Sequence, residues 1–141
     1  MEQAVYQRIK KSFDRQQFLS LIGATLEHAE RGKVVISCKR REELTQQQGL
    51  LHGGVVTTIA DVTCGYTALT VIPEGQEVLT VEFKINLLRP VLAEKIVATG
   101  SVIKTGKTLV ITEAEVRDAV TDKLIAKMLA TMIPSQISEK A

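Results

Sequence analysis

The sequence predicts an α+β fold in which one antiparallel sheet wraps around one long buried helix. Residues 53–71 contain no proline and place apolar side chains at helical spacing. After Pro73, four segments alternate or cluster apolar residues as strands do, and they cover 79–87, 95–104, 108–117 and 123–133. The last three are joined by short connections, which indicates an antiparallel meander. At 141 residues, the chain is expected to form a single domain over 1–141.

The region before the central helix is expected to contain one helix and two strands. An amphipathic pattern predicts an N-terminal helix over 1–19. Strand-like runs follow at 22–28 and 33–39, with a turn at Gly32 between them. At the other end of the chain, the polar residues 135–141 are expected to fray.

The central helix has an unusual composition for a helix. Seven of the ten residues from 55 to 64 are β-branched, so we expect tertiary packing to hold the helix rather than intrinsic propensity. Its expected apolar face is Val55, Ile59, Val62, Tyr66 and Leu69. Its other face carries Gly54, Thr57, Thr58, Asp61, Gly65 and Ala68. A single carboxylate, Asp61, therefore lies among small residues on a buried helix, and this placement calls for an explanation.

The segment 79–87 predicts a long strand with one buried face, because apolar and polar residues alternate along it. A single sheet of this size has two exposed edges. Pairing with a second copy would cover an edge and bury more apolar surface, so we expect at least a homodimer.

Composition excludes several classes of partner. The net charge of +2 is small, and no aromatic residues interleave with the basic clusters, so no nucleic-acid partner is expected. The N-terminal pattern does not predict a signal peptide, and no membrane span is expected because no apolar run approaches the ~18 residues that one requires. Two histidines and the isolated Cys38 and Cys64 do not match a metal site. We expect a soluble, cytoplasmic protein whose cysteines stay reduced.

Several motifs point to one family. His52-Gly53-Gly54 is followed nine positions after the histidine by Asp61. The strand ends in Asn86-Leu87-Leu88-Arg89-Pro90-Val91, and Lys104-Thr105-Gly106-Lys107 joins the next strand pair. Over residues 20–134 the chain resembles the hot-dog acyl-CoA thioesterases, most of all the branch of the phenylacetic acid degradation thioesterase and the Arthrobacter-type 4-hydroxybenzoyl-CoA thioesterase. The resemblance implies a curled sheet around the helix, a double hot-dog dimer that pairs further into a tetramer, and an active site at the dimer interface.

The resemblance also implies roles for individual residues. Asp61 matches the catalytic carboxylate, which acts as general base or nucleophile, and Gly53 matches the residue whose backbone N–H polarises the thioester carbonyl. Gln46 matches an amide that positions water or substrate, although Gln47 and Gln48 are adjacent, and His52 has a supporting role. Candidate contacts to substrate or coenzyme A are Gly54, Thr58, Gly65, Arg89, Lys104 and Lys107. No cofactor is implied, since coenzyme A is part of the substrate. Gly65 departs from relatives that carry Ser or Thr at that position.

The spacing of Gly53 and Asp61 along the predicted helix favours a site shared between chains. A thioester needs a positioned base and a donor for the developing oxyanion. Gly53 and Asp61 are separated along one helix by about 12 Å at 1.5 Å per residue. That distance is too long for both to serve one carbonyl, so a second subunit would have to supply its own glycine.

Other interpretations stay open. Asp61 could instead be a structural acid paired with Arg89, and the basic residues could be solvated surface. The same fold could act as a dehydratase or hydratase on acyl thioesters, or as a non-catalytic acyl-CoA-binding module. The acyl group itself is undetermined, because small residues along the helix suit either a narrow aryl pocket or an aliphatic chain.

Overall fold

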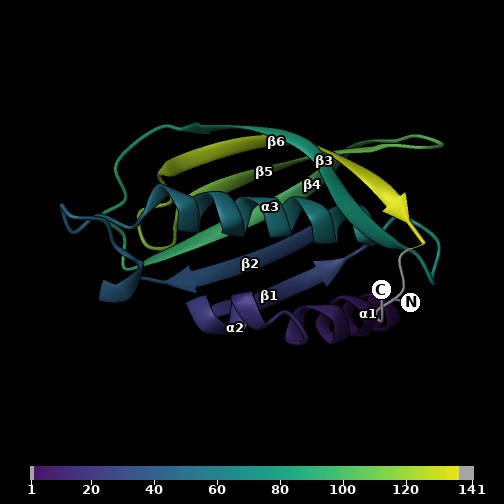
Figure 1. Ribbon diagram of the computed structural model, residues 1–141, viewed down its shortest axis with the longest axis horizontal. Coiled ribbons are helices and arrows are strands. Elements are labelled where there is room, and N and C mark those ends of the chain that lie inside the picture. The colour runs from purple at the N-terminus through teal and green to yellow at the C-terminus, as the bar shows by residue number, and fades with distance from the viewer. Residues whose placement is uncertain (1, 137–141) are drawn as a thin grey trace.

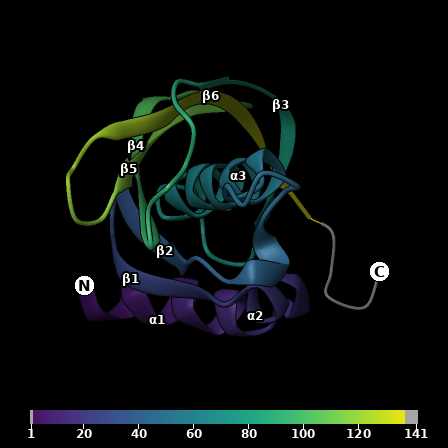
Figure 2. The ribbon, with the colours of Figure 1, turned by 90° about the vertical axis from the view of Figure 1, so that its left-hand side faces the viewer.

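The computed structural model describes residues 2–136, which form a six-stranded antiparallel sheet curled around one helix (Figures 1 and 2). The helices are α1 (Glu2–Asp14), α2 (Gln17–Ile22), the 3₁₀ turn η1 (Glu42–Leu44) and α3 (Gly53–Leu69). The strands are β1 (Ala24–Glu30), β2 (Lys33–Lys39), β3 (Glu77–Leu87), β4 (Lys95–Thr105), β5 (Val110–Asp118) and β6 (Leu124–Ser135). Their spatial order is β1-β2-β4-β5-β6-β3. The predicted fold class and the meander of the last three strands are confirmed.

The N-terminal region forms two helices, so the prediction of one helix over 1–19 is wrong. The amides of Arg15 and Gln16 bond to the carbonyls of Ser12 and Phe13, three residues earlier, which closes α1. Gln16 itself is extended, and α2 then ends at Gly23, whose φ of 79° lies in the left-handed region. Both helices lie beside β1, on the opposite side of α3 from β6 (Figure 2).

The central helix α3 is buried on more of its circumference than the predicted apolar face. Val56 and Ala60, outside that face, are fully buried, whereas Val55 and Val62 are only partly buried. The reason is that the sheet curls around the helix instead of covering one side of it (Figure 2). Thr63 and Thr67 are also fully buried, and each hydroxyl donates to the carbonyl four residues earlier at 2.7 Å. These bonds satisfy the hydroxyls inside an apolar core.

Gly100 of β4 permits this close packing of sheet on helix. A Cβ at this position would overlap the Thr67 hydroxyl and would lie 3.1 Å from the Thr63 carbonyl oxygen. The carbonyl belongs to the helix backbone and cannot rotate away. We therefore expect Gly100→Ala to lower the free energy of unfolding by about 1–3 kcal/mol, as overpacking of a core typically does.

Chemical denaturation of Gly100→Ala, with Gly65→Ala as the matched control, measures this effect. A Cβ at Gly65 would meet only Val78 and Met132 side-chain atoms, at 3.9 and 4.0 Å. Because glycine disfavours a helix interior, the control is expected to be neutral or more stable by up to about 1 kcal/mol. Equal stabilities for Gly100→Ala and wild type would contradict the packing argument.

Strand β3 is an edge strand, and the prediction that one of its faces is buried is wrong for a single chain. Four of its apolar side chains are 40–55% exposed: Leu79, Val81, Phe83 and Leu87. Its one neighbour within residues 2–136 is β6, and a bulge between Thr80 and Glu82 shifts the alternation of its side chains. After the bulge, Phe83 and Leu87 lie opposite the buried Ala130 and Ala126 but have no strand on their other side.

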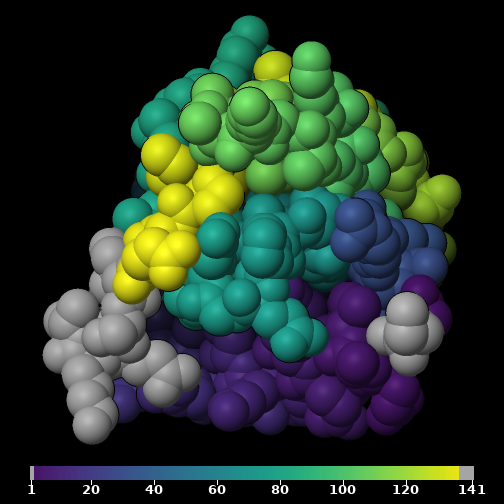
Figure 3. Space-filling view, turned by 90° about the vertical axis from the view of Figure 1, so that its right-hand side faces the viewer, coloured from purple at the N-terminus to yellow at the C-terminus, as the bar shows by residue number. Residues whose placement is uncertain are grey.

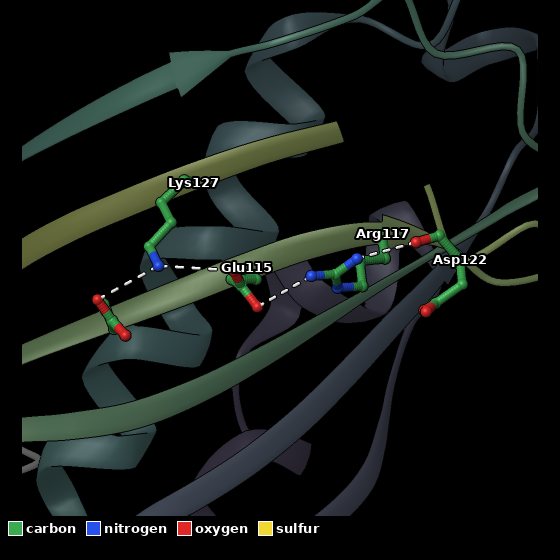
Figure 4. Close-up of polar contacts among 5 residues, drawn as sticks. Glu115, Arg117, Asp122 and Lys127 are labelled. Carbon is green, nitrogen blue, oxygen red and sulfur yellow. Dashed lines mark hydrogen bonds and ion pairs between the residues drawn. The ribbon is translucent and has the colours of Figure 1, made fainter. Parts of the chain in front are cut away.

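The outer face of β5 and β6 carries a chain of charged contacts (Figure 4). Lys127 Nζ lies 3.5 Å from carboxylate oxygens of both Glu113 and Glu115. Glu115 also pairs with Arg117 at 3.3 Å, and Arg117 donates to the Asp122 carbonyl at 2.9 Å. Side chains on this face are about one-third exposed or more, so the pairs contribute little to stability.

Strand β6 reaches into the C-terminal segment that was expected to fray. Ser135 pairs with Glu77 in the sheet, so the strand extends one residue into the tail that was expected to fray. Residues 137–141, the rest of that tail, lie outside the described residues.

Among residues 2–136, no helix has the length and apolar character needed to cross a membrane.

Candidate active site

The start of α3 presents one backbone N–H group without an internal partner. The His52 side chain caps the helix, with Nδ1 accepting from the Gly54 amide at 2.7 Å. The Val55 and Val56 amides both bond to the His52 carbonyl. Within residues 2–136, the Gly53 N–H has no acceptor. It also lies at the positive end of the helix dipole, where it is suited to polarise an oxygen atom.

Gly53 lines a cavity of about 410 Å³, here called the entry cavity, together with Gln46 and Arg89. The remaining lining residues are mostly apolar and include Leu50, Leu51, Val56, Leu87, Leu88 and Val91. The predicted candidates Gln46, Gly53 and Arg89 are thus brought together. The Gln46 amide oxygen accepts from the amides of Gln48 and Leu50, at 2.5 and 3.3 Å, so this side chain also shapes its own loop.

Asp61 lies in the middle of α3, half-buried, where its Oδ1 accepts a 2.9 Å hydrogen bond from the Thr80 hydroxyl of β3. Burial raises the pKa of the Asp61 carboxyl above its ordinary value of 3.8, and the bond from Thr80 acts in the opposite direction. Thr80 is not among the site residues predicted from the sequence. In the sequence, Thr80 is marked only as a polar residue of an alternating strand. Its hydrogen bond to Asp61 depends on how β3 folds back over the helix.

Asp61 and Gly65 line a second cavity of about 280 Å³, here called the acid cavity, between α3 and β3. Thr80 and Val78 of β3 form part of its wall. The cavity runs along α3 to Tyr66 and Leu69 and reaches Ser12 and Gln16 near the end of α1. The carboxylate therefore stands at one end of a space large enough for a small organic group.

Gly53 and Asp61 line different cavities of one chain. This agrees with their separation of about 12 Å along the helix. The interpretation of Asp61 as a structural acid paired with Arg89 is not supported, because Arg89 lies in the entry cavity and its Nε donates to the Leu124 carbonyl at 2.8 Å.

The predicted basic residues do not form one cluster. Lys104 and Lys107 belong to the hairpin between β4 and β5, whereas Arg89 follows β3 at the other end of α3 (Figure 1). Figure 3 shows this hairpin, in green, above the segment that follows α3, in teal. Of the other candidates, Gly54 accepts a 2.9 Å bond from the Thr58 hydroxyl, so both contribute to the first turns of the helix.

Alternative reactive groups are poorly suited to chemistry. The Cys64 side chain is fully buried, and burial raises the pKa of its thiol to about 12, so it stays protonated at neutral pH. Within residues 2–136, no three His, Cys, Asp or Glu side chains come together as a metal site would require. Asp61 lines the acid cavity beside Thr80 and Gly65, and Glu77 places a second carboxylate on the wall of the same cavity.

Comparison with known proteins identifies the family of this chain. The model of the thioesterase superfamily matches residues 48–125, which include the start of α3, Asp61 and strands β3 to β5. The human acyl-coenzyme A thioesterase 13 is 36% identical over 129 residues, covering 90% of this chain and 91% of the relative. A putative esterase of Saccharolobus solfataricus is 33% identical over 115 residues, covering 82% of this chain and 81% of the relative.

Solved structures show the same architecture. The crystal structure of a thioesterase family protein from Silicibacter pomeroyi superimposes with a TM-score of 0.89 at 35% identity, covering 93% of this chain and 98% of that one. The Escherichia coli PaaI protein of the phenylacetic acid degradation operon shares the fold, with a TM-score of 0.86 at 18% identity and 94% coverage of both chains. From the matched family model, the two relatives and the placement of the motif residues, we conclude that this chain belongs to the thioesterase superfamily.

Proposed function

We propose that this thioesterase hydrolyses acyl-CoA thioesters at a site shared between two copies of the chain. The proposal rests on two complementary groups, the Asp61 carboxylate and the Gly53 N–H, that lie apart in one chain. A carboxylate with a raised pKa lies in the acid cavity. The Gly53 N–H, which has no acceptor among residues 2–136, lies in the entry cavity of the same chain, too distant to act with that carboxylate. Two copies would supply each carbonyl with both groups.

Strand β3 gives a physical reason for that assembly. It contributes Leu79 and Thr80 to the acid cavity and Leu87 to the entry cavity. It is also an exposed apolar edge, and unpaired strands of this kind associate readily with another strand. A second copy running alongside β3 would cover this edge and bring its own entry cavity toward Asp61. Further pairing of such dimers into a tetramer stays a prediction.

In the proposed mechanism, the thioester carbonyl lies between Asp61 of one copy and the Gly53 N–H of the other. The Thr80 hydroxyl occupies Oδ1 of Asp61 and leaves Oδ2 for chemistry. The carboxylate either removes a proton from an attacking water or attacks the carbonyl itself, in which case a water molecule then hydrolyses the acyl–Asp61 anhydride and regenerates the carboxylate. The N–H stabilises the negative charge on the carbonyl oxygen, the C–S bond then breaks, and the thiolate leaves and takes up a proton. The products are the free acid and coenzyme A.

The nucleotide end of the substrate needs cationic partners. Arg89, Lys104 and Lys107 stay our candidates for the phosphates of coenzyme A, since guanidinium and ammonium groups bind phosphate oxygens strongly. The curated relative from human is named for activity on acyl-coenzyme A, which supports this class of substrate. A cytoplasmic location, where acyl-CoA is used, also stays a prediction.

Thiol release from acyl-CoA tests the function directly. We expect the purified protein to release free coenzyme A from at least one member of a panel of phenylacetyl-, hydroxybenzoyl-, short-, medium- and long-chain acyl-CoAs, as followed with a thiol-reactive dye. Mass spectrometry of the acyl product should show the free acid. An enoyl or hydroxyacyl thioester as product would indicate a dehydratase or hydratase instead, and tight binding without thiol release would indicate a binding module.

A further inference from the structure

The turn between α3 and β3, residues 70–76, is bound by a side chain from the N-terminal helix. The Arg8 guanidinium donates to the carbonyls of Ile72, Pro73 and Gln76, at 3.0, 2.9 and 3.2 Å. These bonds join parts of the chain that are 64 to 68 residues apart. A guanidinium presents its N–H groups in a rigid planar arrangement, so it fixes the three carbonyl oxygens relative to one another.

Helix α1 gives this turn a firm anchor. The helix buries Ile9 completely and leaves Phe13 only 6% exposed, so its position in the fold is fixed by core packing. The turn itself closes through a long bond, in which the Gln76 amide lies 3.4 Å from the Pro73 carbonyl oxygen. Gln76 directly precedes the first residue of β3. The start of β3 is therefore tied to α1 through Arg8.

The first residues of β3 make the contact on which the Asp61 carboxylate depends, because Thr80 donates to its Oδ1 at 2.9 Å. Residues 77–80 pair with 132–135 of β6, and the bulge between Thr80 and Glu82 separates them from the rest of the strand. Within residues 2–136, β3 has no second neighbouring strand. This short stretch is thus held by β6 along one side and by the turn at its start.

We propose that Arg8 is a positioning residue for the half of the site that contains Asp61: it fixes the turn before β3 and thereby holds the Thr80 hydroxyl on Oδ1 of the carboxylate. Oδ2 is then left in a defined orientation for chemistry. The catalytic meaning of this role rests on the proposed thioesterase function at Asp61, whereas the positioning itself can be measured without activity. Arg8 lies outside the residues 48–125 that the family model matches.

Loss of the Arg8 bonds should be detectable at Asp61. If the Thr80 hydroxyl moves away, the bond that lowers the pKa of Asp61 is weakened, and burial then raises this pKa further. Within residues 2–136, Asp61 forms no ion pair. Other titratable side chains lie on the elements around it: Glu77 of β3, Cys64 and Tyr66 of α3, and Glu113 of β5. The test must therefore separate an effect through Thr80 from an effect through these groups.

A double-mutant cycle makes this separation. The pKa of Asp61 is measured by NMR titration of its side-chain carboxyl carbon in the wild type, Arg8→Met, Thr80→Val and the double variant. Arg8→Met removes the donors and keeps an apolar side chain of similar length. It should raise the pKa by up to about one unit, the size of one hydrogen bond to a carboxylate. The double variant should match Thr80→Val alone, because Arg8 acts through Thr80.

Two further variants separate positioning from charge, since removal of any nearby cation raises the pKa of a carboxylate. Lys11→Met removes a cation from the same helix, beside Arg8 in a cavity that both residues line, but Lys11 donates to none of the three turn carbonyls. It should leave the pKa of Asp61 unchanged. Arg8→Lys keeps the charge and loses the planar fork, so it should still raise the pKa. It also replaces Arg8→Met if circular dichroism shows that the methionine variant does not fold.

The outcomes separate this role from the proposed function. An unchanged pKa of Asp61 in the Arg8 variants, or an equal shift in the Thr80→Val background, would overturn the positioning role, even if the variants were less stable. A shift shared by Lys11→Met and absent from Arg8→Lys would be an effect of charge and would overturn it too. The expected shifts in a protein that releases thiol from none of the thioesters would leave the positioning standing and overturn the thioesterase function.

Discussion

Replacing Asp61 with asparagine is expected to lower kcat for thioester hydrolysis by about 10²- to 10⁴-fold, the usual contribution of a positioned general base. The amide keeps the shape of the side chain and can still accept from Thr80, so folding and acyl-CoA binding should persist. Steady-state thiol release, together with acyl-CoA binding measured by calorimetry, checks both parts. Retention of most of the activity would remove Asp61 from the mechanism.

The same substitution is expected to stabilise the fold at neutral pH. Burial raises the pKa of Asp61, so the folded state carries the cost of a poorly solvated charge at every pH above that raised pKa. The cost disappears as the pH falls below the ordinary value of 3.8, where the carboxyl is protonated in both folded and unfolded chains. The stability gain of Asp61→Asn over wild type should therefore be largest at neutral pH and shrink on acidification, as denaturant unfolding across pH would show.

The pH dependence of activity gives an independent check. Because the carboxylate is the active form, kcat/KM should fall with acidity through a pKa above 3.8. Thr80→Val removes the hydrogen bond that lowers this pKa and should move the acidic limb of the profile to higher pH. An unchanged limb in Thr80→Val would show that another group controls the profile.

Removing the Gly53 N–H is expected to lower kcat by about 10²- to 10³-fold, as removal of one oxyanion donor does in other hydrolases. Gly53→Pro achieves this without losing the helix start, because proline is favoured at the first helical position, where the N–H has no intrahelical partner. His52 has φ −61° and ψ 135°, a conformation that a following proline accepts. Thiol release at saturating substrate is the measurement.

Gly53→Ala is the matched control for steric effects. A Cβ at this position would lie 3.1 Å from Leu87 Cδ1, the flexible end of a side chain that is 54% exposed and can shift. Alanine keeps the N–H, so it should retain most of the activity. If alanine and proline reduced kcat equally, crowding against Leu87 rather than the lost donor would explain the effect.

The two variants together test whether the site is shared between chains. In a dimer of one Asp61→Asn chain and one Gly53→Pro chain, one site has lost both groups and the other has Asp61 from one chain and Gly53 from the other. Random pairing on co-expression makes about half of the dimers mixed, so about a quarter of the wild-type activity should return. Absence of any recovery in mixed dimers, verified by two affinity tags, would place both groups in one chain.

The elements that carry a strong periodic pattern could be predicted from the sequence. The seventeen residues of α3 and the meander of β4 to β6 followed from apolar spacing and short turns, with boundaries correct to within a few residues. The motif around His52 and Asp61 likewise located both halves of the candidate site. Local pattern is sufficient where an element satisfies its own hydrogen bonds or pairs with the next segment along the chain.

Features that depend on distant parts of the chain could not be predicted in this way. The hydrogen bond of Thr80 to Asp61 spans 19 residues and depends on β3 pairing with β6 rather than with the strand that follows it. The break at Gln16 has no proline or glycine to signal it within the helix. The exposure of Phe83 and Leu87 follows from β3 lying at an edge, which the alternating pattern alone does not reveal.

The exposed apolar edge of β3 has a consequence for newly synthesised protein. On the proposal of a shared site, a single chain has no complete site and also presents a strand edge prone to non-specific association. Binding of a second copy would complete the site and cover the β3 edge in one bimolecular step. The rate at which active enzyme forms would then be second order in the concentration of the chain. Dilution below the dissociation constant of the dimer would abolish activity, although the helix that bears Asp61 would stay folded.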